Sequence, residues 1–255
     1  MTTPPPALRQ LRVLSVRDVT PGMRRITFEG RDLERYATDS HLHCRLLIDR
    51  RGGEPAWPWL DEDGQVTWPD EERPAMRKYT IRRIDPDAGR LDIDFVLHGD
   101  HGVGSAFAAR AASGDVIGMV GPGGKGVGAA PAYLLAGDET ALPAIGRILE
   151  SMDGTARGFA FIEVAGERDI QDLRVPGGIT IRWLPRDGAA AGTTRLLEDA
   201  VVACTSEHGV EDTFIWAGTE FDAFRAIRSH VRDALGVPNE RHHVVSYWRR
   251  GVADH

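Results

Sequence analysis

Alternation between apolar and other side chains marks the first half of the chain. In residues 90–98, "RLDIDFVLH", the apolar residues Leu91, Ile93, Phe95 and Leu97 occupy every second position. A period of two is typical of a strand with one buried face. Several short strands separated by turns that contain Gly or Pro predict an antiparallel β-barrel, with residues 52–74 as a long surface excursion. The other predicted strands of this half cover residues 11–20, 23–30, 43–49 and 77–85.

The pattern changes after the "GPGGKGVGAAP" segment, where continuous apolar runs alternate with helically spaced segments. Buried apolar strands that alternate with helices indicate a parallel sheet covered by helices. We therefore predict two domains: an antiparallel β-barrel over residues 1–128 and an α/β domain over residues 129–255. Strands are expected over 132–138, 157–166, 179–186, 212–218 and 242–250, and helices over 140–152, 193–204 and 221–235.

Composition narrows the functional classes. The 255-residue chain is 42% hydrophobic and carries a net charge of −7, which argues against nucleic acid as a partner and requires a local basic cluster for any anionic ligand. Cys44 and Cys204 lack C-x-x-C spacing, so we expect two buried thiols and no metal site. No stretch approaches the roughly 18 apolar residues of a membrane span. These features predict a cytoplasmic protein with no membrane partner, and they leave its oligomeric state open.

Two stretches of the first half carry candidate chemistry. In "RKYTIR", Arg77 and Tyr79 share one side of a strand, which suits a flat anionic ligand. In "HGDHGVGSAFA", glycines lead from a strand end into a helix at Ser105, and the amides of a helix start suit a pyrophosphate. The alternative is an ordinary turn with Ser105 as the helix N-cap.

A third candidate stretch is "AGDETALPAI", which ends a strand and opens a helix in the α/β half. Ligands of open α/β sheets bind outside the carboxyl ends of strands, so Gly137 to Thr140 would face a crevice. The stretch lacks G-x-G-x-x-G and is therefore not the standard dinucleotide fingerprint. The alternative is that Asp138 or Thr140 simply caps the helix.

The order of these features resembles the ferredoxin-reductase-like flavoenzymes and, more narrowly, the siderophore-interacting protein family of ferric-siderophore reductases. The resemblance covers nearly the whole chain and includes a closing "YWRRG" segment at residues 247–251. The other matching motifs are "MRKYTIR", "DFVLHGDHGVGSAFA", "GDVIGMVGPGG", "AGDETALPAI" and "AGTTRLLED".

The resemblance implies an FAD site in the barrel domain and an NAD(P)H site in the α/β domain. Tyr79 would pack against the isoalloxazine ring and Thr80 would bond its edge, while Phe107 would take the aromatic role at the helix start. A C-terminal aromatic, Tyr247 or Trp248, would cover the flavin by analogy; the alternative is that the tryptophan packs into the core. The implied cofactor-binding residues are Arg77, Tyr79, Thr80, Arg82, His98, Gly102, Val103, Gly104, Ser105, Ala106, Thr140 and Trp248.

The implied reaction is reduction of a ferric siderophore by FAD, which takes electrons from NADPH or NADH, with no catalytic side chain and no protein metal ligand. Arg45, Lys125 and Arg249 would bind the anionic chelate. Two alternatives stay open, namely a general flavin reductase or electron-transfer component, and a non-catalytic siderophore-binding flavoprotein; ferredoxin is an alternative donor. For the nucleotide, Glu163 is either a ribose ligand or a solvated strand cap, and Arg182 and Arg186 are candidates for a 2′-phosphate.

Overall fold

The structure, a computed structural model, describes residues 7–49, 55–63, 65–69, 73–97 and 102–252. Its backbone divides into two compact units at Gly124 and Lys125, and the short segment Thr20–Gly22 groups with the second unit. Each unit is described by itself below. The domain ranges 1–128 and 129–255 stay a prediction.

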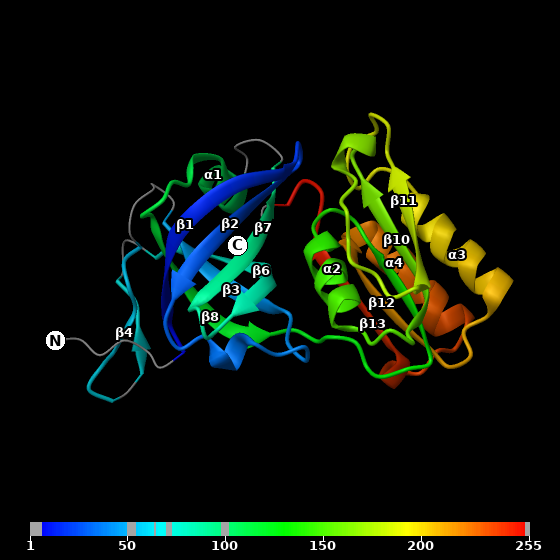
Figure 1. Cartoon of the computed structure of the whole chain (residues 1–255), viewed down its shortest axis with the longest axis horizontal. Helices are drawn as coiled ribbons and strands as arrows, with labels where there is room; N and C mark the ends of the chain where they lie inside the picture. Colours follow the sequence, from blue (N-terminus) through cyan, green and yellow to red (C-terminus); the bar gives the residue numbers. More distant parts are fainter. Residues whose placement is uncertain (1–6, 50–54, 64, 70–72, 98–101, 253–255) are drawn as a thin grey trace. The chain divides into compact units, whose positions relative to one another are not determined.

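The first unit is a closed barrel of antiparallel strands in the order β1-β2-β7-β6-β3-β8 (Figure 1). The predicted barrel is thus confirmed, and helix α1 (Val103–Arg110) follows β7 along the chain. A short 3₁₀ turn covers Glu34–Tyr36. The barrel strands are β1 (Arg9–Thr20), β2 (Met23–Gly30), β3 (His43–Ile48), β6 (Ala75–Asp85), β7 (Arg90–Val96) and β8 (Val116–Gly123).

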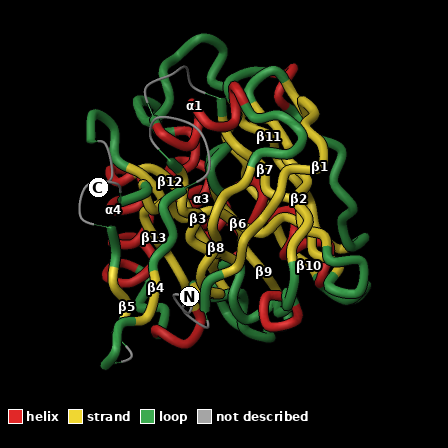
Figure 2. The backbone as a smooth tube through the Cα atoms, turned by 90° about the vertical axis from the view of Figure 1, so that its left-hand side faces the viewer, coloured by secondary structure: helices red, strands yellow, loops and turns green. Residues whose placement is uncertain are grey.

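The apolar residues of the predicted alternation lie in the barrel core. Leu91, Ile93 and Phe95 are each at most 1% exposed and belong to one apolar cluster. Within the excursion at residues 52–74, β4 (Trp59–Leu60) and β5 (Val66–Thr67) form a two-stranded ribbon of their own (Figure 2).

The second unit is a parallel sheet in the order β11-β10-β9-β12-β13, as the sequence predicts. Short helical turns cover Glu167–Asp169, His230–Ala234 and Asn239–Arg241. Its main elements are β9 (Ala132–Gly137), α2 (Leu142–Ser151), β10 (Arg157–Val164), β11 (Gly178–Pro185), α3 (Leu196–His208), β12 (Thr213–Glu220), α4 (Phe221–Ser229) and β13 (His242–Trp248).

Helices cover both faces of this sheet (Figure 1). Leu134 and Ala136 of β9 pack in a cluster with Leu197 and Val201 of α3. Because successive side chains of a strand point to opposite faces, Leu135 packs on the other face of the sheet. All five strands run the same way, so their carboxyl ends share one edge.

A buried ion pair joins β2 and β7 on the strand faces opposite the apolar core. The guanidinium of Arg25 on β2 donates two hydrogen bonds to the carboxylate of Asp94 on β7, at 2.5 and 2.7 Å. The two side chains are only 5% and 1% exposed. Removing one member of such a pair leaves the other charge buried and uncompensated.

We expect Arg25→Leu to lower the free energy of unfolding of the barrel unit by about 3–5 kcal/mol. The double variant Arg25→Leu/Asp94→Leu should recover most of this loss, because it buries no charge. Urea unfolding followed by tryptophan fluorescence measures both. The control is Arg12→Leu, which removes an exposed pair with Glu29 at 3.8 Å and should cost less than about 1 kcal/mol. Equal losses for the two single variants would contradict the prediction.

Candidate functional site

Tyr79 presents its ring from β6 beside the barrel core. The ring centroid lies 4.4 Å from that of Phe95, with the planes tilted by 43°. The residue is half-buried. Burial raises the pKa of the phenol well above its ordinary value, so the hydroxyl stays protonated and neutral at physiological pH.

Among the described residues, no side chain caps the start of helix α1 at its N-cap position. Gly102 is the N-cap residue in an extended conformation, and the first turn contains no acidic residue. The alternative of Ser105 as N-cap is therefore wrong; Ser105 lies inside the helix and is 4% exposed. The amides of a first helical turn, here those of Val103 and Gly104, lack intrahelical acceptors and sit at the positive end of the helix dipole. This donor set suits a phosphate.

The phenol and the helix start meet at Gly104. A Cβ atom added to Gly104 would lie 1.8 Å from the Tyr79 hydroxyl oxygen and 2.9 Å from Cζ. Only glycine allows the tyrosine this close to the helix. The structure thus places side by side the two features that the sequence singled out for an aromatic ligand with a phosphate tail.

The other predicted residues of this unit occupy different environments. Thr80 and Arg82 are 6% and 3% exposed, whereas the guanidinium of Arg77 donates to the Met76 carbonyl at the surface, at 3.0 Å. Ala106 belongs to the first turn of α1, and its amide donates to the Gly102 carbonyl at 2.8 Å. His98 lies outside the described residues.

Phe107, expected to take an aromatic role at the helix start, is a core residue instead. Its side chain is 5% exposed and packs in the barrel core, with its ring centroid 5.9 Å from that of Phe95. This burial leaves no ring face for an adenine.

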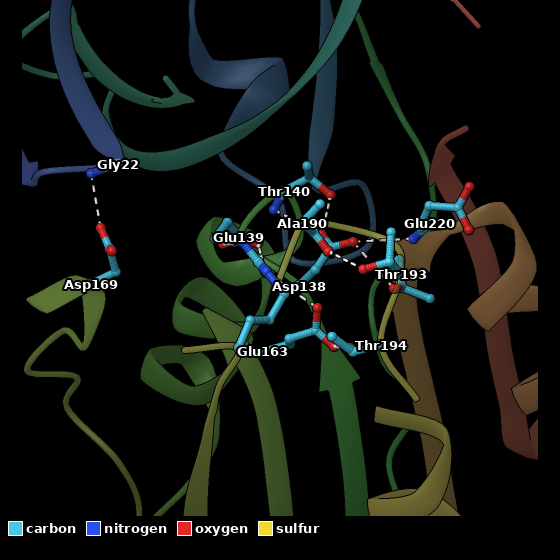
Figure 3. Close-up of polar contacts among 12 residues, drawn as sticks. Gly22, Asp138, Glu139, Thr140, Glu163, Asp169, Ala190, Thr193, Thr194 and Glu220 are labelled. Atoms are coloured by element: carbon cyan, nitrogen blue, oxygen red, sulfur yellow. Dashed lines mark hydrogen bonds and ion pairs between the residues drawn. The ribbon is translucent and has the colours of Figure 1, made fainter. Parts of the chain in front are cut away.

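At the carboxyl edge of the parallel sheet, the Asp138 carboxylate accepts hydrogen bonds from several strand ends (Figure 3). Its Oδ1 accepts from the amide and hydroxyl of Thr140, at 2.9 and 2.5 Å. Its Oδ2 accepts from the Thr219 hydroxyl at 3.2 Å, the Glu220 amide at 3.1 Å and the Trp248 indole at 2.8 Å. The residue is 4% exposed. Thr140 and Trp248, both predicted cofactor ligands, are thus brought together on one carboxylate.

The "YWRRG" segment is held by the same edge. The Glu220 carboxylate accepts from the Arg250 amide at 3.0 Å and also caps helix α4 through the Asp222 amide. The ring of Tyr247 packs edge-on against the ring of Trp216, with 6.2 Å between the ring centroids. Both aromatics of the segment therefore contact residues of the α/β unit.

Arg186 lies just beyond β11 in a network of carboxylates. Both terminal nitrogens donate to Glu139, and Nη1 also donates to Glu163 at 3.2 Å. The Thr194 hydroxyl donates to the other Glu163 oxygen at 2.8 Å (Figure 3). Burial raises the pKa of Glu163. Within the described part of the chain, Nε of Arg186 has no hydrogen-bond partner.

These contacts correct two expectations from the sequence. Glu163 is 5% exposed and is not a solvated strand cap. Arg186 has a side chain only 6% exposed and already bound to carboxylates, so it is not poised for a 2′-phosphate. Arg182 lies over the ring of Phe159, near the start of β10, and so away from the carboxyl edge.

The predicted substrate residues are exposed. Arg45 on β3 lies directly opposite Lys78 on β6, and both are at the surface. Lys125 is exposed, and the Arg249 guanidinium stacks 4.6 Å from the ring centroid of Phe221. Sequence reasoning missed Lys78 as a neighbour of Arg45, because the pairing depends on a strand register that the motif does not encode.

Comparison with known proteins gives the family. A family model described as "Siderophore-interacting FAD-binding domain" matches residues 12–126, and one described as "Siderophore-interacting protein" matches residues 130–251. The chain belongs to the siderophore-interacting protein family. The barrel is its FAD-binding domain, and the uncapped α1 start beside the Tyr79 ring fits a flavin that carries a diphosphate.

Several relatives of this siderophore-interacting protein are similar over nearly their whole length. The chain is 31% identical to ferric vibriobactin reductase ViuB of Vibrio cholerae, covering 91% of this chain and 86% of the relative. It is 30% identical to the NADPH-dependent ferric-chelate reductase of Escherichia coli, covering 94% and 92%. A siderophore utilization protein from T. fusca has a crystal structure with a TM-score of 0.81 and 37% identity, covering 96% and 94%.

More distant structures share the fold alone. Ferredoxin-NADP+ reductase from Plasmodium falciparum matches with a TM-score of 0.65 at 15% identity, over 93% of this chain and 95% of that chain. The fold is therefore of the ferredoxin-reductase type, as the sequence predicts. Among the described residues, no helix has the length and apolar character needed to cross a bilayer, and no group of His, Cys, Asp and Glu could hold a metal ion.

We expect Gly104→Ala to weaken FAD binding, because its Cβ would push the Tyr79 phenol out of place. Overpacking of this kind costs about 1–3 kcal/mol, which corresponds to roughly a tenfold to hundredfold higher Kd. Fluorescence titration of the apoprotein with FAD measures the change. Gly154→Ala, whose Cβ meets no atom within 4 Å, is the control. An unchanged Kd for Gly104→Ala would show that the phenol position is irrelevant to the flavin.

Proposed function

We propose that this protein is an FAD-dependent reductase that takes electrons from NADPH or NADH and reduces a ferric siderophore, so that Fe(II) is released. The observation that carries the proposal is the Tyr79 ring against the uncapped start of helix α1. The names of the relatives from Vibrio cholerae and Escherichia coli, both ferric reductases, support the reaction class. We place the reaction in the cytoplasm, where the nicotinamide donor is found.

FAD, when bound, supplies the conversion between a two-electron hydride donor and a one-electron metal acceptor. The chain's own residues bind and orient it. Tyr79 offers a neutral aromatic face for a flat ring. Thr80 is the proposed ligand of the ring edge, and Arg77 is the proposed ligand of the phosphate or ribityl oxygens. The first-turn amides of α1 would hold the diphosphate.

The substrate proposal rests on exposed basic residues. Arg45 and Lys78 are like charges placed directly opposite each other on neighbouring strands, an arrangement that costs stability unless an anion lies nearby. In a chain with a net charge of −7, such a pair provides the local positive potential that an anionic chelate requires. Lys125 and Arg249 are the further proposed contacts. Fe(III) prefers hard anionic oxygen ligands, and Fe(II) binds them far less tightly, so reduction releases the metal without a protein ligand.

The test uses purified protein loaded with FAD under anaerobic conditions. Addition of NADH or NADPH should bleach the flavin absorbance, and a ferric siderophore should then restore it while an Fe(II)-specific chelator reports the product. Tyr79→Ala should lose bound FAD and hence the yellow colour. A flavin that stays oxidised with both nucleotides would contradict the proposed donor. A reduced flavin that is not reoxidised by ferric siderophores, but is by oxygen or free flavin, would favour a general flavin reductase.

We expect Arg45→Ala/Lys78→Ala to raise KM for an anionic ferric siderophore by about tenfold, the size of a lost hydrogen bond to a charged group. The rate of flavin reduction by the nucleotide should not change, because these side chains contact only the chelate. Steady-state and stopped-flow kinetics separate the two steps. Arg31→Ala, at another exposed arginine of the barrel unit, is the control. If the double variant and the control have the same KM, the substrate site lies elsewhere.

A further inference from the structure

The charge balance at the carboxyl edge of the parallel sheet is acidic. Four carboxylates lie there, those of Asp138, Glu139, Glu163 and Glu220, against three arginines: Arg186, which Glu139 and Glu163 hold, and the exposed Arg249 and Arg250. Asp138, Glu163 and Glu220 are each at most 5% exposed. Water therefore screens these charges weakly, and their field acts on any ligand that reaches the edge.

Glu163 stands at a position that has a defined role in dinucleotide-binding sheets. It belongs to the end of β10, the strand that follows β9 and α2 along the chain. In such folds an acidic residue at this place accepts a hydrogen bond from the ribose 2′-hydroxyl of NAD, whereas a nearby arginine accommodates the 2′-phosphate of NADP. Both residue types are present here, so their mutual contacts decide between the two nucleotides.

The contacts of Arg186 disfavour binding of the 2′-phosphate of NADPH. Glu139 occupies both terminal nitrogens of the guanidinium, and Glu163 shares one of them. A 2′-phosphate could reach these donors only by displacing Glu139. That exchange would leave the Glu139 carboxylate, whose side chain is only 13% exposed, without its partner. It would also bring two further negative charges to an acidic edge.

We propose that Glu139 and Glu163, by holding Arg186, make this site selective for NADH over NADPH. The inference rests on the proposed function, since it concerns the nucleotide that reduces the flavin. Glu139 is the specificity-determining residue, because it masks the guanidinium, and Glu163 shares one of its donors. No covalent step is involved beyond hydride donation by the nucleotide.

The experiment compares kcat/KM for flavin reduction by NADH and by NADPH, and it measures binding of 5′-AMP and 2′,5′-ADP by calorimetry. We expect the wild-type protein to prefer NADH by at least about tenfold, the discrimination expected from one unfavourable charge contact. Glu139→Gln should raise the NADPH/NADH ratio about tenfold and strengthen binding of 2′,5′-ADP, because it releases the guanidinium. The double variant Glu139→Gln/Arg186→Gln should lose this gain.

Glu211→Gln, an exposed residue in the turn before β12, is the matched control and should leave both ratios unchanged. A wild-type preference for NADPH, or a Glu139→Gln variant with the wild-type ratio and the wild-type affinity for 2′,5′-ADP, would overturn the inference. If neither nucleotide reduces the flavin, the proposed function fails, and the calorimetric comparison of the two adenosine phosphates still decides on the selectivity of the edge.

Discussion

The α/β half of the site depends on the hydrogen bonds that the buried carboxylate of Asp138 accepts. A charge at 4% exposure is costly unless hydrogen bonds satisfy it, and here five donors do so. They come from the turn before α2, the end of β12 and the end of β13. One side chain thus fixes the places where three chain segments leave the sheet, including the indole of Trp248. Any nucleotide that binds at this edge meets a preorganised surface.

The barrel half of the site depends on close packing between a side chain and a helix backbone. Gly104 has no side chain, so the Tyr79 hydroxyl can lie where a Cβ would otherwise be. This brings an aromatic face and the first-turn amides of α1 within one small region, although they come from segments separated by β7. The buried pair of Arg25 and Asp94 supports β7 from within the unit. Packing and charge satisfaction together keep the flavin-binding face in place.

Local patterns predict the elements well, because they depend on near neighbours. Period-two alternation located the strand that carries Leu91 and Ile93, and the motif order indicated the family. Contacts set by strand register could not be predicted. Asp94 has the polar partner Arg25 on a strand 69 positions away in the chain, and Glu139, Glu163 and Arg186 meet only after β9, β10 and β11 are aligned. Ser105 has high N-cap propensity, yet the extended backbone of Gly102 begins the helix.

The number of arginines near a site is therefore a poor guide to where anions bind, and the partners of each arginine are a better one. Arg25 and Arg186 both form ion pairs with carboxylates of low exposure. Their charges are therefore already neutralised within the fold. Arg45 lies opposite another cation, Lys78, across the strand pair. An anion at that surface relieves repulsion, whereas an anion at Arg186 must first break an ion pair. The same residue type thus attracts one anionic ligand and excludes another.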